Sequence, residues 1–172
     1  MHTELGFSTF QAHQLEDRLE HLFHEKRVTG REAWSRLFDE TIAALRFPLD
    51  GRQLGIAEIL HHLSDYDRDM RRRAGKSFGR VLGDNLRIFS LVTNTLAKDK
   101  EICERWRGVE GGADARQLAN RVEREVVDAL SESGRGAYPQ LSHRYYALKG
   151  RGFGKDALDF WDRNAPLPKT EQ

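Results

Sequence analysis

Apolar positions recur at helical spacing along most of the chain. In residues 13–26 they form one stripe made of Leu15, Leu19, Leu22 and Phe23. A second stripe is made of Trp34, Leu37, Phe38, Ile42 and Leu45. Between the stripes, Thr29 and Glu32 have the Thr-x-x-Glu spacing that is typical of a capping box at a helix start. The pattern therefore predicts two successive helices, the first over 13–26.

The helical pattern breaks between Phe47 and Leu54. Asp50-Gly51 stands between two short arms, and this dipeptide is a strong hairpin signal because glycine accepts a positive φ. Pro48 has no amide hydrogen, so any strand here has to be an edge strand. We therefore expect at most one short β-hairpin near residues 45–54, and then a short helix over about 56–63.

A long apolar stripe follows Ser64-Asp65-Tyr66-Asp67, which looks like a helix start. The stripe consists of Ala74, Phe78, Val81, Leu82, Phe89, Val92 and Leu96. Glycine costs about 1 kcal/mol against alanine inside a helix. The glycines at 75, 79 and 83 are therefore expected at a close approach or a bend. The sequence predicts one long helix here and a further helix over Glu101–Arg107.

The last third of the chain also has helical spacing, interrupted by glycine. After a loop over Gly108–Asp114, apolar residues four positions apart predict a helix from Leu118 to about Glu132, ended by Ser133-Gly134. A further helix is expected after Pro139, interrupted by the glycines at 150, 152 and 154. The sum is an all-α fold: a multi-helix array with at most one hairpin.

Composition limits the classes of protein and partner that are reasonable. The chain has 172 residues, enough for one domain or two small ones with a real core. The 28 Lys and Arg residues nearly balance 27 Asp and Glu residues, for a net charge of +1, which argues against nucleic acid as a partner. A single cysteine suits a reducing, cytoplasmic location. We expect neither a signal peptide nor a membrane span.

Two motifs imitate known ligand sites without matching them. His21 and His24 are three positions apart, whereas a zincin helix needs them four apart with glutamate directly after the first histidine. We interpret them as part of a polar helix face. Gly75-Lys76-Ser77 imitates the end of a phosphate-binding loop, but Met70 occupies the place of the required first glycine. We therefore predict no metal site and no nucleotide site here.

A local group of basic residues lies in the predicted long helix. It consists of Arg68, Arg71, Arg72, Arg73, Lys76 and Arg80. Such a face could bind nucleic acid or a peptide carboxylate. Asp65, Asp67 and Asp69 lie nearby, so we favour a solvated face with acidic neighbours.

The segment His143-Arg144-Tyr145-Tyr146 offers the best candidate for ligand contact. An imidazole, a guanidinium and two hydroxyl groups suit recognition of a peptide backbone or carboxylate, so these four residues are possible peptide-cleft contacts. Two helical tyrosines could equally be packing residues with their hydroxyls at the rim. Both interpretations stay open. Cys103 has no activating partner in the sequence and is interpreted as a structural thiol.

Several long motifs, in one order, carry a family resemblance. They are His13-Gln14-Leu15, Leu22-Phe23-His24-Glu25-Lys26, Ala33-Trp34-Ser35-Arg36-Leu37-Phe38-Asp39-Glu40-Thr41, Asn94-Thr95-Leu96-Ala97-Lys98-Asp99-Lys100, Arg105-Trp106-Arg107, Leu118-Ala119-Asn120-Arg121-Val122-Glu123, Glu125-Val126-Val127-Asp128-Ala129-Leu130, the run from Tyr138 to Lys149, and Trp161-Asp162-Arg163-Asn164-Ala165-Pro166-Leu167-Pro168. With these motifs, the chain resembles the oligoendopeptidase F family of thimet-oligopeptidase-like zinc metallopeptidases.

The resemblance implies a mostly helical protein whose two lobes enclose a channel in which zinc-dependent hydrolysis cuts short peptides. By this resemblance, residues 1–64 correspond to the N-terminal helical region, 65–168 to the first helices of the peptidase domain, and 169–172 to a tail. The sequence contains no His-Glu-x-x-His, and Gln117 stands where the family pattern implies histidine. No catalytic or zinc-binding residue carries over to this chain.

Two functional expectations follow. The first is a truncated oligoendopeptidase F-like protein that is inactive alone and holds no cofactor of its own, although the full-length family uses zinc. The second is a stand-alone helical module that binds short peptides or proteins, including a separate catalytic half. An exposed apolar face would favour the second expectation.

Overall fold

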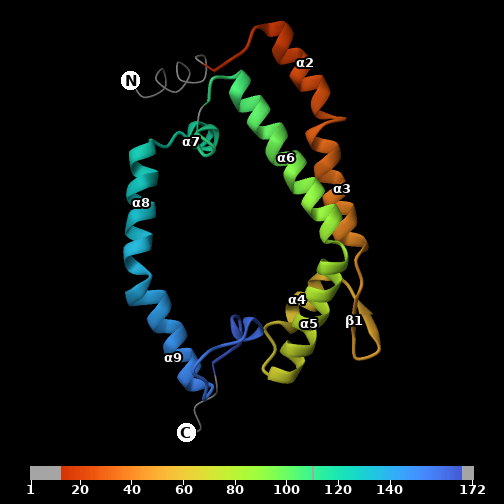
Figure 1. The fold of residues 1–172 in the computed structure, drawn as a ribbon, viewed down its shortest axis with the longest axis vertical. Coiled ribbons are helices and arrows are strands. Elements are labelled where there is room, and N and C mark those ends of the chain that lie inside the picture. Colours follow the sequence, from red (N-terminus) through yellow and green to blue (C-terminus); the bar gives the residue numbers. More distant parts are fainter. Residues whose placement is uncertain (1–12, 110, 168–172) are drawn as a thin grey trace. The chain divides into compact units, whose positions relative to one another are not determined.

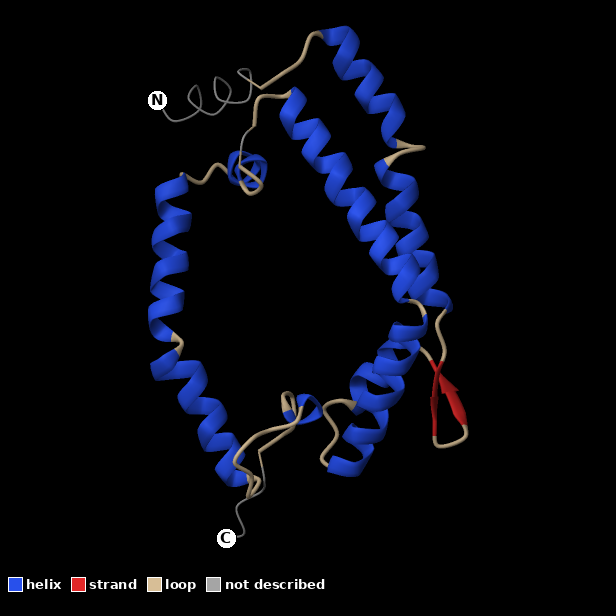
Figure 2. Ribbon diagram, viewed as in Figure 1, coloured by secondary structure: helices blue, strands red, loops and turns tan. Residues whose placement is uncertain are grey.

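The computed structural model describes residues 13–109 and 111–167. In this part of the chain, helices account for most residues and two strands form an antiparallel hairpin (Figures 1 and 2). The helices are α2 (Asp17–Arg27), α3 (Arg31–Ala44), α4 (Ile56–His62), α5 (Arg68–Asp84), α6 (Leu86–Trp106), α7 (Asp114–Asn120), α8 (Arg124–Ala137), the π-helical turn η1 (Pro139–His143), α9 (Arg144–Gly152) and the 3-10 turn η2 (Phe160–Asp162). The strands are β1 (Phe47–Leu49) and β2 (Arg52–Leu54). The expected all-α class with one short hairpin is confirmed.

The chain forms two compact units. Unit 1 consists of Met1–Phe38 and Phe89–Gly134, and unit 2 consists of Asp39–Ile88 and Arg135–Gln172. Each unit is therefore assembled from two separate segments of sequence. The division after Ser64 that the family resemblance implies cuts the sequence at one point, and it stays a prediction.

Unit 2 has its core where the hairpin packs on α4 and α5. The buried residues of this core are Phe47, Leu49, Leu54, Ile59 and Ala74. The hairpin pairs Phe47 with Leu54 and Leu49 with Arg52. Asp50 and Gly51 both have positive φ, at 49° and 80°, as a two-residue hairpin turn requires. The Asp-Gly turn predicted from the sequence is therefore confirmed.

An aspartate caps the start of helix α5, and a glycine lets η2 pack closely on it. The Asp67 side chain accepts a hydrogen bond from the Asp69 amide and caps the first turn, within the predicted start region. At Gly75 an added Cβ would lie 2.9 Å from Cζ of Phe160, so this glycine permits close approach of η2. At Gly79 and Gly83 a Cβ would meet nothing within 4 Å. The expected close approach is therefore found at only one of the three glycines.

In unit 1, α2 lies against the C-terminal part of α6. The rings of Phe23 and Trp106 meet edge to face with centroids 6.3 Å apart. His13 Nδ1 lies 2.9 Å from the carbonyl oxygen of Arg107, which joins the chain before α2 to the end of α6. Helix α3 begins at Arg31, two residues after Thr29, and the Glu32 carboxylate pairs with Arg27 at 3.1 Å. The capping box expected at this helix start stays a prediction.

Three predicted helix boundaries are wrong. The long helix is divided into α5 and α6 at Asn85, whose side-chain amide donates to the Val81 carbonyl at 2.9 Å and ends α5. The separate helix over Glu101–Arg107 is the continuous end of α6. The helix predicted from Leu118 is interrupted at Arg121, which adopts a left-handed conformation with φ 54°.

The glycines of the last third interrupt helices less than expected. Helix α8 continues through Ser133-Gly134 to Ala137, and α9 includes Gly150 and Gly152. Gly154, with φ 64°, lies beyond the end of α9. In residues 13–109 and 111–167, no helix combines the length and apolar character needed to cross a membrane.

Candidate functional site

His143, Arg144, Tyr145 and Tyr146 lie in unit 2, where η1 passes into α9. All four side chains are exposed. The two tyrosine rings meet edge to face with centroids 5.3 Å apart. His143 is the last residue of the π-helical turn η1, and such turns inside helices are frequent at functional sites. Their exposure agrees with both interpretations, ligand contact and packing at a rim.

Tyr146 lines two hollows in the surface of unit 2. The first, with a volume of about 620 Å³, is formed by Gln140, Leu141, Ser142, Arg144, Tyr145, Tyr146 and Leu148. The second, of about 480 Å³, is formed by Tyr146, Ala147, Asp156, Leu158, Asp159, Phe160 and Arg163. The structure therefore brings three of the four candidate residues to one hollow, and His143 lines neither. Their role as peptide contacts stays a prediction.

An apolar stripe runs along the same segment. Leu141, Tyr145 and Leu148, spaced i, i+4 and i+7, are 67%, 46% and 60% exposed. We call these three residues the η1–α9 face. This stripe is the kind of exposed apolar face that the second functional expectation requires.

Lys149 holds α9 in place from its buried side. It is 2% exposed, and its Nζ donates a hydrogen bond to the carbonyl oxygen of Arg163 at 2.8 Å. The ammonium group also lies 5.9 Å from the centre of the Tyr145 ring. The tyrosines are thus presented on a helix that is anchored to the segment after η2.

The basic group of α5 is only partly the solvated face that the sequence predicted. Arg73 pairs with Asp50 and Arg72 with Asp69, and these pairs are exposed. Arg71 is instead fully buried and donates to Asp162, which is also fully buried. The solvated interpretation is therefore wrong for Arg71, because its acidic partner comes from η2.

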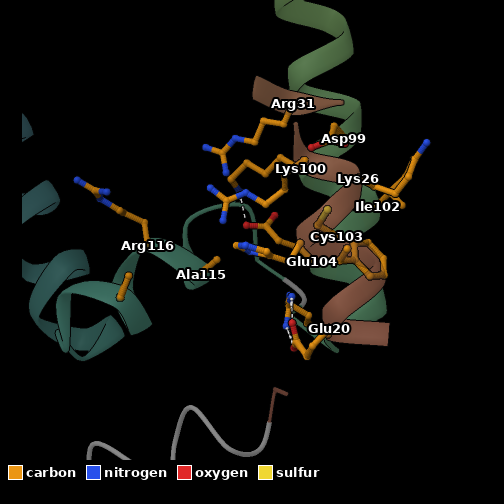
Figure 3. Close-up of a pocket in the computed structure, with 15 residues that line it drawn as sticks. Glu20, Lys26, Arg31, Asp99, Lys100, Ile102, Cys103, Glu104, Ala115 and Arg116 are labelled. Atoms are coloured by element: carbon orange, nitrogen blue, oxygen red, sulfur yellow. Dashed lines mark hydrogen bonds and ion pairs between the residues drawn. The ribbon is translucent and has the colours of Figure 1, made fainter. Parts of the chain in front are cut away.

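A third hollow lies in unit 1, and the sequence did not indicate it. It has a volume of about 560 Å³ and is lined by residues of α2, α6 and α7, by the first residue of α3 and by Arg107, which follows α6 (Figure 3). We call it the α2–α6 pocket. Its lining is Glu20, Phe23, His24, Lys26, Arg27, Arg31, Asp99, Lys100, Ile102, Cys103, Glu104, Arg107, Ala115, Arg116 and Ala119.

Two of the lining residues, Glu20 and Arg107, form an ion pair. Arg107 donates from both terminal nitrogens to the two carboxylate oxygens of Glu20, and the Nη2–Oε2 distance is 2.8 Å. These hydrogen bonds favour the ionised carboxylate and lower the pKa of Glu20 to about 2. The same pairing raises the pKa of Arg107. The pair joins α2 to the residue that follows α6.

Cys103 lies on the wall of the α2–α6 pocket. Burial and the nearby Asp99 raise the pKa of its thiol, and this outweighs the opposite influence of Arg107 and Arg31. The thiol form is therefore favoured, as the structural interpretation from the sequence implies.

The two motifs that imitate a zinc site and a phosphate-binding loop lie in surroundings that suit neither ligand. His21 Nε2 lies 3.3 Å from Glu25, and both side chains are largely exposed. The described residues contain no group of three or more His, Cys, Asp or Glu side chains arranged to hold a metal ion. Gly75-Lys76-Ser77 lies inside α5, with Gly75 against η2. None of these residues fits the zinc site or the phosphate loop that the motifs imitate.

The comparison with protein families points to one family. The family model described as Oligopeptidase F matches residues 8–47. The chain is similar to Oligopeptidase F. The match includes α2 and α3, and it begins in residues outside the described part. The resemblance found in the sequence motifs is therefore confirmed for this N-terminal portion. No curated protein and no solved structure matches the chain.

Proposed function

We propose that this chain is a non-catalytic helical part of an oligopeptidase F-type system that hydrolyses short peptides in the cytoplasm. In this proposal, its η1–α9 face binds a peptidase part that carries the His-Glu-x-x-His helix and zinc. The observation that carries the proposal is the exposure of Leu141, Tyr145 and Leu148 on one helical stripe. The match of residues 8–47 to Oligopeptidase F supports the choice of partner.

Burial of the η1–α9 face gives binding its driving force. Each of its three side chains has about half or more of its surface exposed, and burying a large apolar side chain contributes about 1.5–3 kcal/mol. Arg144, also exposed, is available beside the stripe for a carboxylate of the partner. Residues of this kind, aromatic and arginine, commonly carry binding energy at interfaces.

The test combines the purified chain with the peptidase portion of an oligopeptidase F-type enzyme. Zinc-dependent cleavage of a quenched-fluorescent peptide is measured for each part alone and for the mixture. The proposal expects activity in the mixture and none from this chain alone. Zinc-dependent cleavage by the chain alone, or failure of the two parts to associate, would refute it.

A double variant locates the contact. Leu141→Ser with Leu148→Ser should abolish the gain in activity without unfolding the chain, because both side chains are exposed. Leu86→Ser is the matched control, since Leu86 is 63% exposed at the start of α6, outside the face. Equal losses in the control and in the double variant would show that the face is not the contact.

The two hollows beside Tyr146 favour a second function, direct binding of short peptides by this chain. Binding of a fluorescent peptide to the chain alone, weakened by Tyr146→Ala, would support that function. The absence of binding to any member of a random short-peptide mixture would exclude it.

A further inference from the structure

We propose that the α2–α6 pocket binds a small organic carboxylate with an apolar group beside the charge. The pocket belongs entirely to unit 1 and shares no residue with the η1–α9 face. The proposal therefore stands whether or not the docking function is correct.

The pocket has an apolar wall of suitable size. Its apolar lining is formed by Phe23, Ile102, Cys103, Ala115 and Ala119. A volume of about 560 Å³ lies within the range of small-molecule sites, which are usually lined by apolar side chains with a few polar groups. The wall has room for a short aliphatic or amino-acid side chain.

The charge of the lining selects an anion. Six Lys and Arg residues and three carboxylates line the pocket, a net charge of +3 with His24 neutral, whereas the whole chain carries +1. Positive potential gathered in a concave site attracts anions. The pocket is therefore far more basic than the molecule as a whole.

Three of the six cations are already engaged within the protein. Arg107 binds Glu20, Arg27 binds Glu32, and Lys100 binds both Glu104 and the carbonyl oxygen of Gly112. In the part of the chain that the structure describes, no hydrogen bond or ion pair engages the side-chain nitrogens of the other three, Lys26, Arg31 and Arg116. These three retain their full capacity to bind an anion.

Arg31 is the best placed of the free cations. In Figure 3 its side chain extends toward the side on which α7 lies, whereas Lys26 points away from α7. Arg31 and Cys103 line the same pocket, and the positive charge of Arg31 acts to lower the pKa of the Cys103 thiol. A carboxylate held by Arg31 would thus place its apolar group beside Cys103. The planar guanidinium matches a carboxylate with two parallel hydrogen bonds.

The test uses N-acetyl-leucine, with N-acetyl-leucinamide and acetate as matched ligands that lack the charge or the apolar group. Titration calorimetry measures binding to the full chain. The rate at which iodoacetamide modifies Cys103, the single cysteine, reports occupancy of the wall. We expect N-acetyl-leucine to bind and to slow modification, and the other two to do neither. Equal behaviour of N-acetyl-leucine and its amide, or of N-acetyl-leucine and acetate, would overturn the proposal.

Two variants distinguish a specific contact with Arg31 from a general effect of positive charge on binding. Loss of a charge-assisted hydrogen bond by Arg31→Gln should weaken binding of N-acetyl-leucine about tenfold or more. Arg18→Gln, on the exposed surface of α2 outside the pocket, should leave it unchanged. Circular dichroism checks that both variants stay folded. Equal weakening in the two variants, or unchanged binding in Arg31→Gln, would contradict a role for Arg31.

Discussion

Arg71 and Asp162, 91 positions apart in sequence, form a fully buried ion pair in which Nη2 of Arg71 donates to Oδ1 of Asp162 at 3.0 Å. The same guanidinium also donates to the carbonyl oxygens of Asp65, Tyr66 and Trp161, at 2.8, 3.0 and 3.2 Å. Burial by itself would raise the pKa of Asp162, but Arg71 and Arg68 outweigh it and the pKa lies below its usual value. The pair ties η2 to α5.

Removing one charge of the Arg71–Asp162 pair should lower the free energy of unfolding. Asp162→Asn leaves the buried guanidinium of Arg71 without a counter-charge, and breaking a buried pair in this way costs about 3–5 kcal/mol. The free energy of unfolding from urea denaturation measures the effect. Asp69→Asn is the control, because the Asp69–Arg72 pair is exposed and should contribute less than about 1 kcal/mol. A loss for Asp162→Asn no greater than the control would contradict the buried pair.

Two glycines of α5 should respond differently to alanine. Gly79→Ala places its Cβ in open space and should stabilise the protein by about 1 kcal/mol through helix propensity. Gly75→Ala has to displace the ring of Phe160, whose Cζ would lie 2.9 Å from the new Cβ, so much of that gain should be lost. Thermal unfolding compares the two variants. Equal stabilisation would show that η2 does not pack on Gly75.

The Glu20–Arg107 pair predicts a specific dependence of stability on pH. The pKa of Glu20 is lowered from 4.5 to about 2, so its contribution is complete above pH 4.5 and is lost as pH falls toward 2. Glu20→Gln should therefore be less stable than the wild type at neutral pH, with the difference shrinking over this window. Denaturation at a series of pH values measures it. Glu25→Gln, which alters an exposed residue of the same helix, should show a smaller difference at neutral pH.

The hairpin turn depends on glycine at one position. Gly51 has φ 80°, a conformation that costs an L-residue about 1–2 kcal/mol. Gly51→Ala should lower the free energy of unfolding by about that amount, although its Cβ would meet nothing within 4 Å. Denaturant melts of the variant and the wild type give the comparison. An unchanged midpoint would mean that the turn relaxes without cost.

Local signals made the hairpin and the start of α5 predictable. Asp50-Gly51 and Pro48 specify a turn and an edge strand within a few residues, and Asp67 caps a helix from two positions away. The helix breaks at Asn85 and Arg121 were missed because the apolar stripes continue across both residues. Periodicity reports which residues face a core, and it is only weakly sensitive to a single residue that leaves the helical conformation.

Contacts between distant segments could not be predicted from the sequence. Nothing near Arg71 indicates that its partner is Asp162, and the three closer aspartates at 65, 67 and 69 were the natural choice. The α2–α6 pocket was likewise missed, because Glu20 and Arg107 are 87 positions apart in sequence. The only local hint was that each lies close to an aromatic residue, Phe23 and Trp106. The exposed tyrosines were identified from the sequence, but their hollows needed the structure.

Because unit 2 consists of two separate segments of sequence, its parts are synthesised at different times. Ribosomes add about 5–20 residues each second, so Asp162 emerges roughly 5–20 s after Arg71. During that delay the α5 surface around Ala74 and Gly75 lacks the covering of η2. A nascent chain in this state exposes a bare guanidinium and an apolar patch together, the kind of surface that chaperones bind. Unit 2 can therefore be completed only after its second segment, Arg135–Gln172, has been made.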